Sequence, residues 1–223
     1  MMHYATYLTD PALAAPMRLQ LAGQWDMALN ILGDYSADLR AEITADRFMW
    51  QLGSIDMGVI NAASPATATL LTARISYWHK LFELEGGPDV DEAAVYAATP
   101  GGWAAFWHAV VQDNVHKNSE LAKAEFARAR ELCADDPFLE SYVVRHQGYY
   151  LLETDREAGL LLLRRSLQLR AALGARPQTA AAQLALASAL GDEHPETADL
   201  KAIAWATAEE LNMPGLKKPA TEQ

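Results

Sequence analysis

A recurring helix-start signal is the feature that most restricts how this chain of 223 residues can fold. Proline is tolerated at the first position of a helix, where its missing N–H has no intrahelical partner, and a preceding Asp, Ser or Thr can cap the exposed amides. Such pairs occur at Asp10-Pro11, Ser64-Pro65, Thr99-Pro100 and Asp136-Pro137, with weaker versions at Arg176-Pro177 and His194-Pro195. From Pro65 through Pro100 and Pro137 to Pro177 the signals are spaced by about 35 to 40 residues, the period of helix-hairpin repeats. The sequence therefore predicts an all-α chain of repeated helix pairs.

Apolar side chains between these signals recur at three- and four-residue spacing, which gathers them on one face of a helix. The clearest case is residues 102–116, where the apolar positions include Trp103, Phe106, Trp107 and Val110. The expected pairs are 11–22 with 25–37, 39–52 with 54–62, 65–85 with 89–98, 102–116 with a helix after Asn118, 137–153 with 155–173, and 177–190 with 195–211. The second pair, with its break at Gly53, has one kinked helix as an alternative.

Several helix ends can be assigned from single residues. Thr99 is the expected N-cap of the helix over 102–116, and Thr154 forms a capping box with Glu157. Gly86-Gly87-Pro88 is the expected stop of the helix over 65–85. Because no stretch has linker composition, we predict one helical repeat domain, residues 1–213, followed by a polar C-terminal tail, residues 214–223.

The composition excludes several classes of function. A formal charge of −11 and a pI near 4.9 argue against a nucleic-acid partner, because phosphate recognition needs a basic face. The N-terminus lacks the pattern of a signal peptide, and no apolar run reaches the ~18 residues of a membrane span. Cys133 is the only cysteine, which excludes an internal disulfide and a multi-cysteine zinc site. We expect a cytoplasmic protein without a membrane partner.

The second half of the chain resembles the tetratricopeptide repeat family. Ala122, Phe126 and Ala129 have the small–aromatic–small spacing of that family's second helix, and Trp107 stands where its first helix carries a large aromatic. Residues 164–190 look like the longer-turn repeats common in bacterial regulators. The resemblance implies a right-handed α-solenoid of about six antiparallel helix pairs, whose first helices line a concave groove. It implies no reaction.

Three expected first helices carry a histidine in aromatic surroundings: His79, His108 and His146. Helical spacing gathers further side chains around them, and Arg145 is well placed for an anionic group. The predicted ligand- or partner-binding residues are Trp78, His79, Phe82, Trp107, His108, Val111, Asn114, Tyr142, Arg145, His146 and Tyr149. Histidines at the apolar edge of a helix are more often core residues with satisfied nitrogens, so that structural interpretation stands beside the binding one.

The sequence predicts no catalytic residues, cofactor or metal site. Nucleophile elbows, phosphate loops and helical zinc-ligand spacings do not occur. Tetratricopeptide proteins that bind carboxylate tails use Lys, Arg and Asn side chains in the groove. In the repeat that begins with residues 102–116, Asn114 is the one residue of these types at the matching positions. A more apolar partner is therefore favoured.

Three functions follow as hypotheses. The first is a non-catalytic scaffold whose open aromatic and histidine-lined groove binds a peptide or protein segment. The second is a small-molecule binder or enzyme with a closed pocket that holds Arg145 and at least two of His79, His108 and His146. The third is a homodimer formed through apolar faces of the terminal helices.

Overall fold

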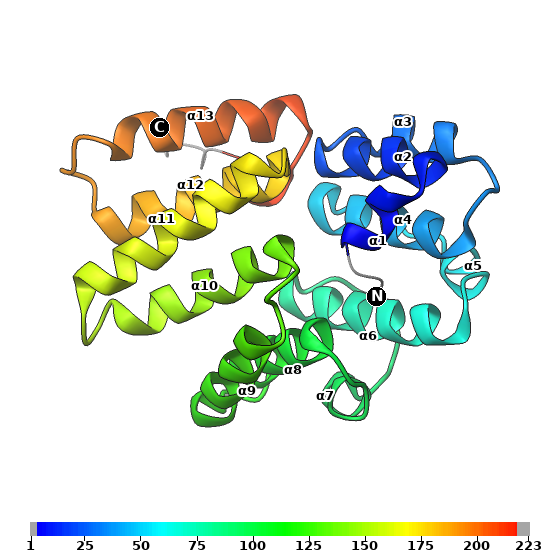
Figure 1. The fold of residues 1–223 in the computed structure, drawn as a ribbon, viewed down its shortest axis with the longest axis horizontal. Coiled ribbons are helices and arrows are strands. Elements are labelled where there is room, and N and C mark those ends of the chain that lie inside the picture. The colour runs from blue at the N-terminus through cyan, green and yellow to red at the C-terminus, as the bar shows by residue number, and fades with distance from the viewer. Residues whose placement is uncertain (1–3, 218–223) are drawn as a thin grey trace.

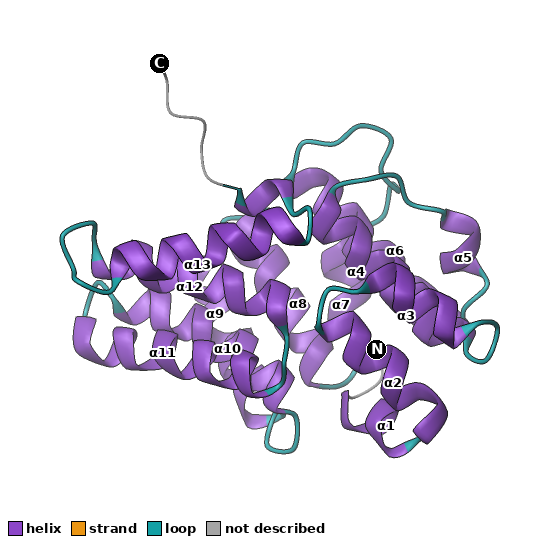
Figure 2. Cartoon of the chain, turned by 90° about the horizontal axis from the view of Figure 1, so that it is seen from above, coloured by secondary structure: helices purple, strands orange, loops and turns teal. Residues whose placement is uncertain are grey.

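The computed structural model describes residues 4–217, which contain thirteen α-helices, one short 3₁₀-helix and no strand (Figure 2). The all-α prediction is thus confirmed. The elements in chain order are α1 (Tyr4–Thr9), α2 (Pro11–Leu21), α3 (Trp25–Leu32), α4 (Ala37–Gln51), α5 (Met57–Asn61), α6 (Pro65–Leu81), α7 (Glu92–Ala97), α8 (Gly102–Asn114), α9 (Ser119–Glu131), α10 (Pro137–Leu151), α11 (Arg156–Ala172), α12 (Arg176–Leu190), α13 (Thr197–Glu210) and the 3₁₀-helix η1 (Pro214–Leu216).

Several helix ends differ from the sequence prediction because of local backbone geometry. Helix α3 stops at Leu32 rather than at 37, since Gly33 has a positive φ. Helix α6 stops at Leu81, before the expected Gly86-Gly87-Pro88, and Glu83 takes a positive φ in the turn that follows. The predicted caps also move: Gly101 replaces Thr99 at the start of α8.

Asp155 rather than Thr154 caps α11, because its side chain accepts the amide hydrogen of Ala158. Helix α1 lies where no helix was predicted. The expected tail contains η1, and its last six residues lie outside the described residues.

Helices that follow one another in the chain pack together, most extensively α10 with α11, α8 with α9, and α12 with α13, followed by α11 with α12 and α2 with α3. Small residues on α9 allow close approach, since Ala122 and Ala129 are fully buried on either side of the equally buried Phe126. Gly148 and Gly159 do the same for α10 and α11, where a Cβ on either glycine would come within 3.0 Å of the facing backbone.

The first and last helices of the chain also pack against each other (Figure 1). One apolar cluster joins Trp25 and Leu39, near the N-terminus, to Ala204, Leu211 and Met213, near the C-terminus. The side-chain amide of Gln51 donates to the carbonyl of Leu211 at 3.2 Å across the same contact. The chain therefore makes a closed circuit of helices in which α2 to α4 lie beside α12 and α13.

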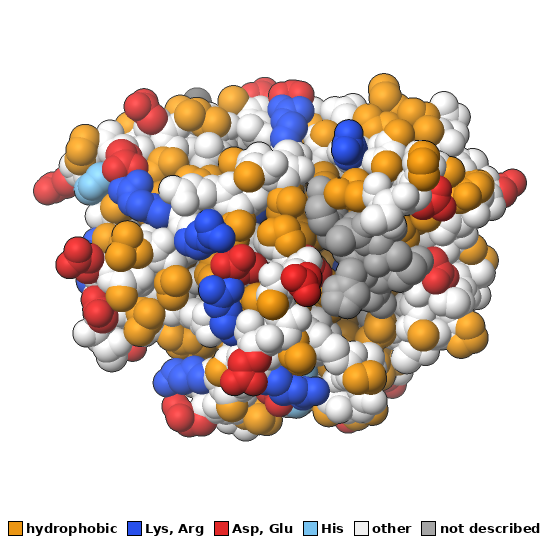
Figure 3. All heavy atoms as spheres, viewed as in Figure 1, with side chains coloured by type: hydrophobic (Ala, Val, Ile, Leu, Met, Phe, Trp, Pro, Cys, Tyr) orange, Lys and Arg blue, Asp and Glu red, His pale blue; other side chains and the backbone are white. Residues whose placement is uncertain are grey.

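Charged side chains of both signs are mixed on the face seen in Figure 3, over the part formed by α10 to α13. Two of the underlying pairs are Arg164 with Glu196 and Arg176 with Glu210. Such exposed pairs contribute little to stability. They also leave no basic patch of the kind that a nucleic acid needs on that face.

The contact between the chain ends can be tested at Gly23, which has φ +77° and would place a Cβ 2.6 Å from Leu211. Gly174 is a matched control because it has φ +71° and nothing within 4 Å. We expect Gly174→Ala to lower the free energy of unfolding by about 1 kcal/mol through backbone strain alone. Gly23→Ala should cost about 1 to 3 kcal/mol more, because buried Leu211 must move. Urea denaturation measures both, and equal losses would contradict the closing contact.

Candidate functional site

The inner faces of six helices converge on a central cavity of about 340 Å³. Its lining comes from α2, α4, α6, α8, α10 and α12, with Tyr7 added by α1. The alternate helices α3, α5, α7, α9, α11 and α13 contribute no described side chain to this lining. A cavity of this size, at the meeting point of several elements, is the usual setting of a small-molecule site.

One wall of the cavity is aromatic. Trp103, Phe106 and Tyr142 contact one another at ring-centroid distances of 5.4 to 5.9 Å, in near edge-to-face geometry. Trp107 and Trp78 continue the wall at 6.2 Å from each other. Because each ring is held by its neighbours, this wall is rigid and presents flat apolar surface to the cavity.

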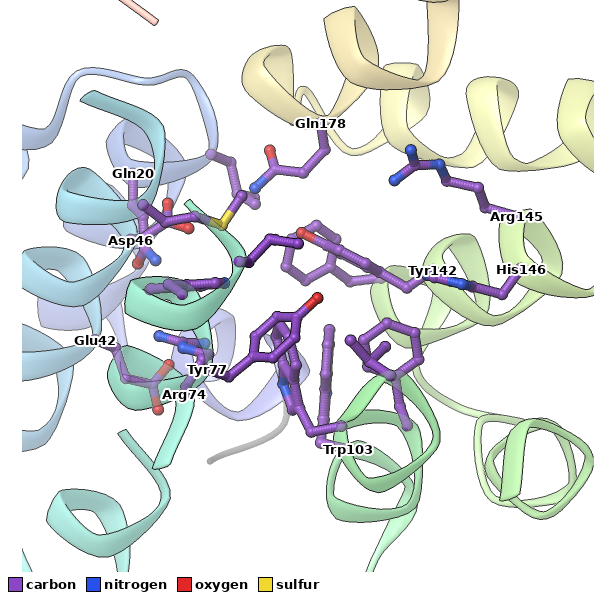
Figure 4. Close-up of a pocket in the computed structure, with 18 of the residues that line it drawn as sticks. Gln20, Glu42, Asp46, Arg74, Tyr77, Trp103, Tyr142, Arg145, His146 and Gln178 are labelled. Carbon is purple, nitrogen blue, oxygen red and sulfur yellow. The ribbon is translucent and has the colours of Figure 1, made fainter. Parts of the chain in front are cut away.

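The side of the cavity formed by α4 is acidic (Figure 4). Glu42 accepts the hydroxyl hydrogen of Tyr7 at 3.2 Å, and Asp46 accepts the indole hydrogen of Trp25 at 3.0 Å. Burial raises the pKa of Asp46, against the opposing effects of the Trp25 hydrogen bond and the positive charge of Arg74. The guanidinium of Arg74 lies 4.8 Å from the ring centroid of Trp78, and its positive charge acts on Asp46, so this side of the cavity also holds a cation.

The opposite side of the cavity, formed by α10, is basic (Figure 4). Arg145 makes no ion pair within 4.0 Å among the described residues, and its Nε atom is buried without a hydrogen bond. Behind Tyr142 lies Arg170, which is fully buried with its guanidinium 4.5 Å from the Tyr142 ring. Its Nη1 donates to the carbonyl of Gln178 at 3.0 Å, while Nη2 has no partner. Burial and the nearby Arg145 lower the pKa of Arg170 to about 9.

His146 lies beside Arg145 on the cavity wall. Its ring stacks on Phe126 at 4.6 Å and meets Phe106 edge-on at 5.6 Å. Burial first, and then the charges of Arg145 and Arg170, lower the pKa of His146 to about 3. The imidazole is therefore neutral at ordinary pH and presents one N–H donor and one acceptor nitrogen.

Two tyrosine hydroxyls lie between the acidic and basic sides, where Figure 4 shows Tyr77 and Tyr142 pointing into the middle of the cavity. The Asn114 amide donates to the Tyr77 hydroxyl at 2.7 Å. Burial raises the pKa of Tyr77 to about 12 and also raises that of Tyr142. Both groups are neutral phenols at physiological pH, and each can donate one hydrogen bond to a ligand.

Six of the eleven residues predicted from the sequence line the cavity: Trp78, Trp107, Asn114, Tyr142, Arg145 and His146. Five do not. Val111 is fully buried in the packing around α8, Phe82 lies at the end of α6, and Tyr149 is 37% exposed. The structure brings only one of the three histidines to the cavity, so the pocket expected to hold two of them with Arg145 is not formed.

The other two histidines have structural surroundings. The Nδ1 of His108 lies 3.5 Å from Glu125 on α9, and its Nε2 lies 3.2 Å from the Gln112 amide. His79 stacks on Phe48 of α4 at 5.2 Å and fills the space beside Gly87. These two imidazoles join neighbouring elements, which is the core role that the sequence analysis left open.

The sequence analysis did not select several charged or polar cavity residues, among them Gln20, Glu42, Asp46 and Arg74. A usable signal was present, because Arg74 interrupts the apolar stripe of its helix between Leu70 and Trp78. A charged residue on a buried face needs a partner or a role. Glu42 and Asp46, four residues apart on α4, give the same signal.

Residues 4–217 contain no group of three His, Cys, Asp or Glu side chains close enough to hold a metal ion. Within the same part of the chain, no helix combines the length and the apolar character needed to cross a membrane.

Comparisons with family models, with curated proteins and with solved structures find no match to this chain. Any function must therefore be argued from the cavity itself.

The lowered pKa of His146 predicts acid-sensitive stability. In the unfolded chain the imidazole takes a proton near pH 6.5, whereas the native state takes it only near pH 3, so stability falls as the pH drops through this interval. We expect His146→Phe to remove this effect. Between pH 7 and pH 4.5 the variant should lose about 2 to 3 kcal/mol less unfolding free energy than the wild type.

Urea denaturation at the two pH values measures this difference. His116→Phe is the control, because His116 is exposed and should leave the pH dependence unchanged. If His146→Phe and the wild type lost the same free energy, the imidazole would be protonated normally in the native state.

Proposed function

We propose that this protein binds a small organic molecule in the central cavity. The observation that carries the proposal is the composition of the cavity lining, in which an aromatic wall stands beside residues with buried polar atoms that make no hydrogen bond, among them Trp107 Nε1 and Arg145 Nε. Burying unpaired polar groups costs free energy, and proteins keep such groups mainly where a ligand satisfies them. Aromatic walls with a few fixed polar groups are typical of small-molecule sites.

The peptide-binding scaffold predicted from the sequence remains an alternative. It needs an open groove along successive first helices, as in the tetratricopeptide-like solenoid that the residues resemble. The inward position of α2, α4, α6, α8, α10 and α12 agrees with such an arrangement. The packing of α2 to α4 against α12 and α13 leaves less room for an extended chain, which is why we favour a small ligand.

Binding rather than catalysis is the simpler role for these residues. His146 is neutral and has no carboxylate partner to orient it, and burial keeps the Tyr77 and Tyr142 hydroxyls protonated. Acid–base catalysis near neutral pH favours groups with pKa values close to 7.

The cytoplasmic location stays a prediction based on the lone Cys133, which is buried. The homodimer also stays a prediction, to be tested by sedimentation.

Filling the cavity should abolish binding. Met49 lines the cavity from α4, and Met49→Trp would occupy part of its volume. Met27→Trp is the matched control, because Met27 is 52% exposed on α3. We expect calorimetric titration with two naphthalene probes, neutral 1-naphthaleneacetamide and anionic 1-naphthaleneacetate, to show one saturable site for at least one probe. Met27→Trp should bind as the wild type does, and Met49→Trp at least about tenfold more weakly.

The proposal would be overturned if neither probe gave saturable binding to the wild-type protein. It would also fail if Met49→Trp, with native helix content by circular dichroism, bound as tightly as Met27→Trp.

A further inference from the structure

The geometry points to an organic anion as the ligand, a flat ring system with one carboxylate or phosphate group held by Arg145. This inference rests on the proposed function and adds the chemical class of the ligand. Three features of the cavity carry it: the distribution of charge, the lack of partners for Arg145, and the position of the aromatic wall.

The two sides of the cavity differ in charge. On the α4 side, Glu42 and Asp46 face the guanidinium of Arg74, so charges of both signs are present. On the α10 side, Arg145 lines the cavity and Arg170 of α11 lies behind Tyr142, and neither guanidinium has a carboxylate within 4.0 Å among the described residues. The protein carries a formal charge of −11, yet these two neighbouring guanidinium groups form no ion pair among the described residues.

Arg145 is costly to the fold without a ligand. It lies partly buried near another arginine, its Nε atom lacks a hydrogen bond, and its guanidinium lies 5.8 Å from the centroid of the Tyr149 ring. Like charges in a low-dielectric environment repel, and a desolvated guanidinium without an acceptor is unfavourable. A bound carboxylate or phosphate would supply the missing acceptor through a two-point hydrogen bond and reduce the repulsion.

The neutral imidazole of His146 can also bind an anionic ligand. Its ring is fixed by Phe126 and Phe106, and one of its nitrogens carries a hydrogen that can be donated to an anionic oxygen. The tyrosine hydroxyls of Tyr77 and Tyr142 point into the same space (Figure 4). Arg145, His146 and the two tyrosines thus all contribute hydrogen-bond donors among the residues that line the cavity.

The aromatic wall explains why the rest of the ligand should be flat. Trp103 and Tyr142 are 5.5 Å apart in near edge-to-face geometry, next to the position of Arg145 on α10. A ligand ring can stack on these surfaces while its anionic group reaches the guanidinium. An inorganic anion would use Arg145 alone and would leave the apolar wall uncovered.

The test compares 1-naphthaleneacetate with 1-naphthaleneacetamide, which have nearly the same shape and differ in charge. We expect the full-length protein to bind the acetate at least about tenfold more tightly in calorimetric titration, because only the acetate pairs with Arg145. In Arg145→Met the preference should fall to about threefold or less. Arg18→Met removes the same charge from an exposed position on α2 and should keep the full preference.

A stability measurement separates this role from a structural one. Because Arg145 has no stabilising ion pair, Arg145→Met should melt at the same temperature as the wild type or above it. Arg145→Lys keeps the charge without the planar fork and should retain part of the preference. Adding 1-naphthyl phosphate identifies the anion: tighter binding than the acetate indicates a phosphate monoester, and weaker binding indicates a carboxylic acid.

Two results would overturn the inference and leave the proposed function intact: equal affinity of the wild type for acetate and acetamide, or an undiminished preference in Arg145→Met. Loss of native helix content in Arg145→Met would also overturn it, because Arg145 would then be needed for the fold. Absence of binding by both probes would instead overturn the proposed function.

Discussion

The packing of the first helices against the last is the interaction on which the rest of the structure depends. Helices that pack only on their chain neighbours would leave the inner faces of α2 and α12 uncovered at the two ends of the array. The apolar cluster that joins Trp25 and Leu39 to Leu211 and Met213 removes those ends. By closing the circuit, it also turns the inner faces of six helices toward one cavity.

The cavity concentrates features that an optimally stable core would avoid. Arg145 and Arg170 lie close together without a carboxylate, and the imidazole of His146 is held neutral. Apolar side chains of similar volume at these positions would pack without a desolvation cost. Departures from the most stable choice are common at binding sites, because groups that await a ligand cannot also be satisfied by the protein. A ligand of the proposed kind would account for the unpaired polar atoms on the inner faces.

The helices themselves could be predicted well because their signals are local. Pro11, Pro65 and Pro137 begin helices α2, α6 and α10 as their capping pairs predict. The errors in the predicted helix ends also have local causes. Pro100 precedes α8 without belonging to it, because Gly101 provides the cap. Periodicity alone cannot choose between such neighbouring starts, since both place the same apolar side chains on the buried face.

The site was only half predictable. Trp107, Arg145 and His146 were found because aromatic and basic residues recur on expected first helices, whereas Glu42 and Arg74 were missed. His79 and His108 share the sequence surroundings of His146, but in the structure they contact Phe48 and Glu125 on neighbouring helices and do not line the cavity.

The sequence by itself determined the all-α class, the order of the helices and the apolar face of each one. These properties depend on backbone propensity and on spacing within a few turns. Only the tertiary structure decided that the chain ends meet and that a cavity forms between them. It also decided which charged side chains share that cavity, because each of these results depends on contacts between residues far apart in the chain.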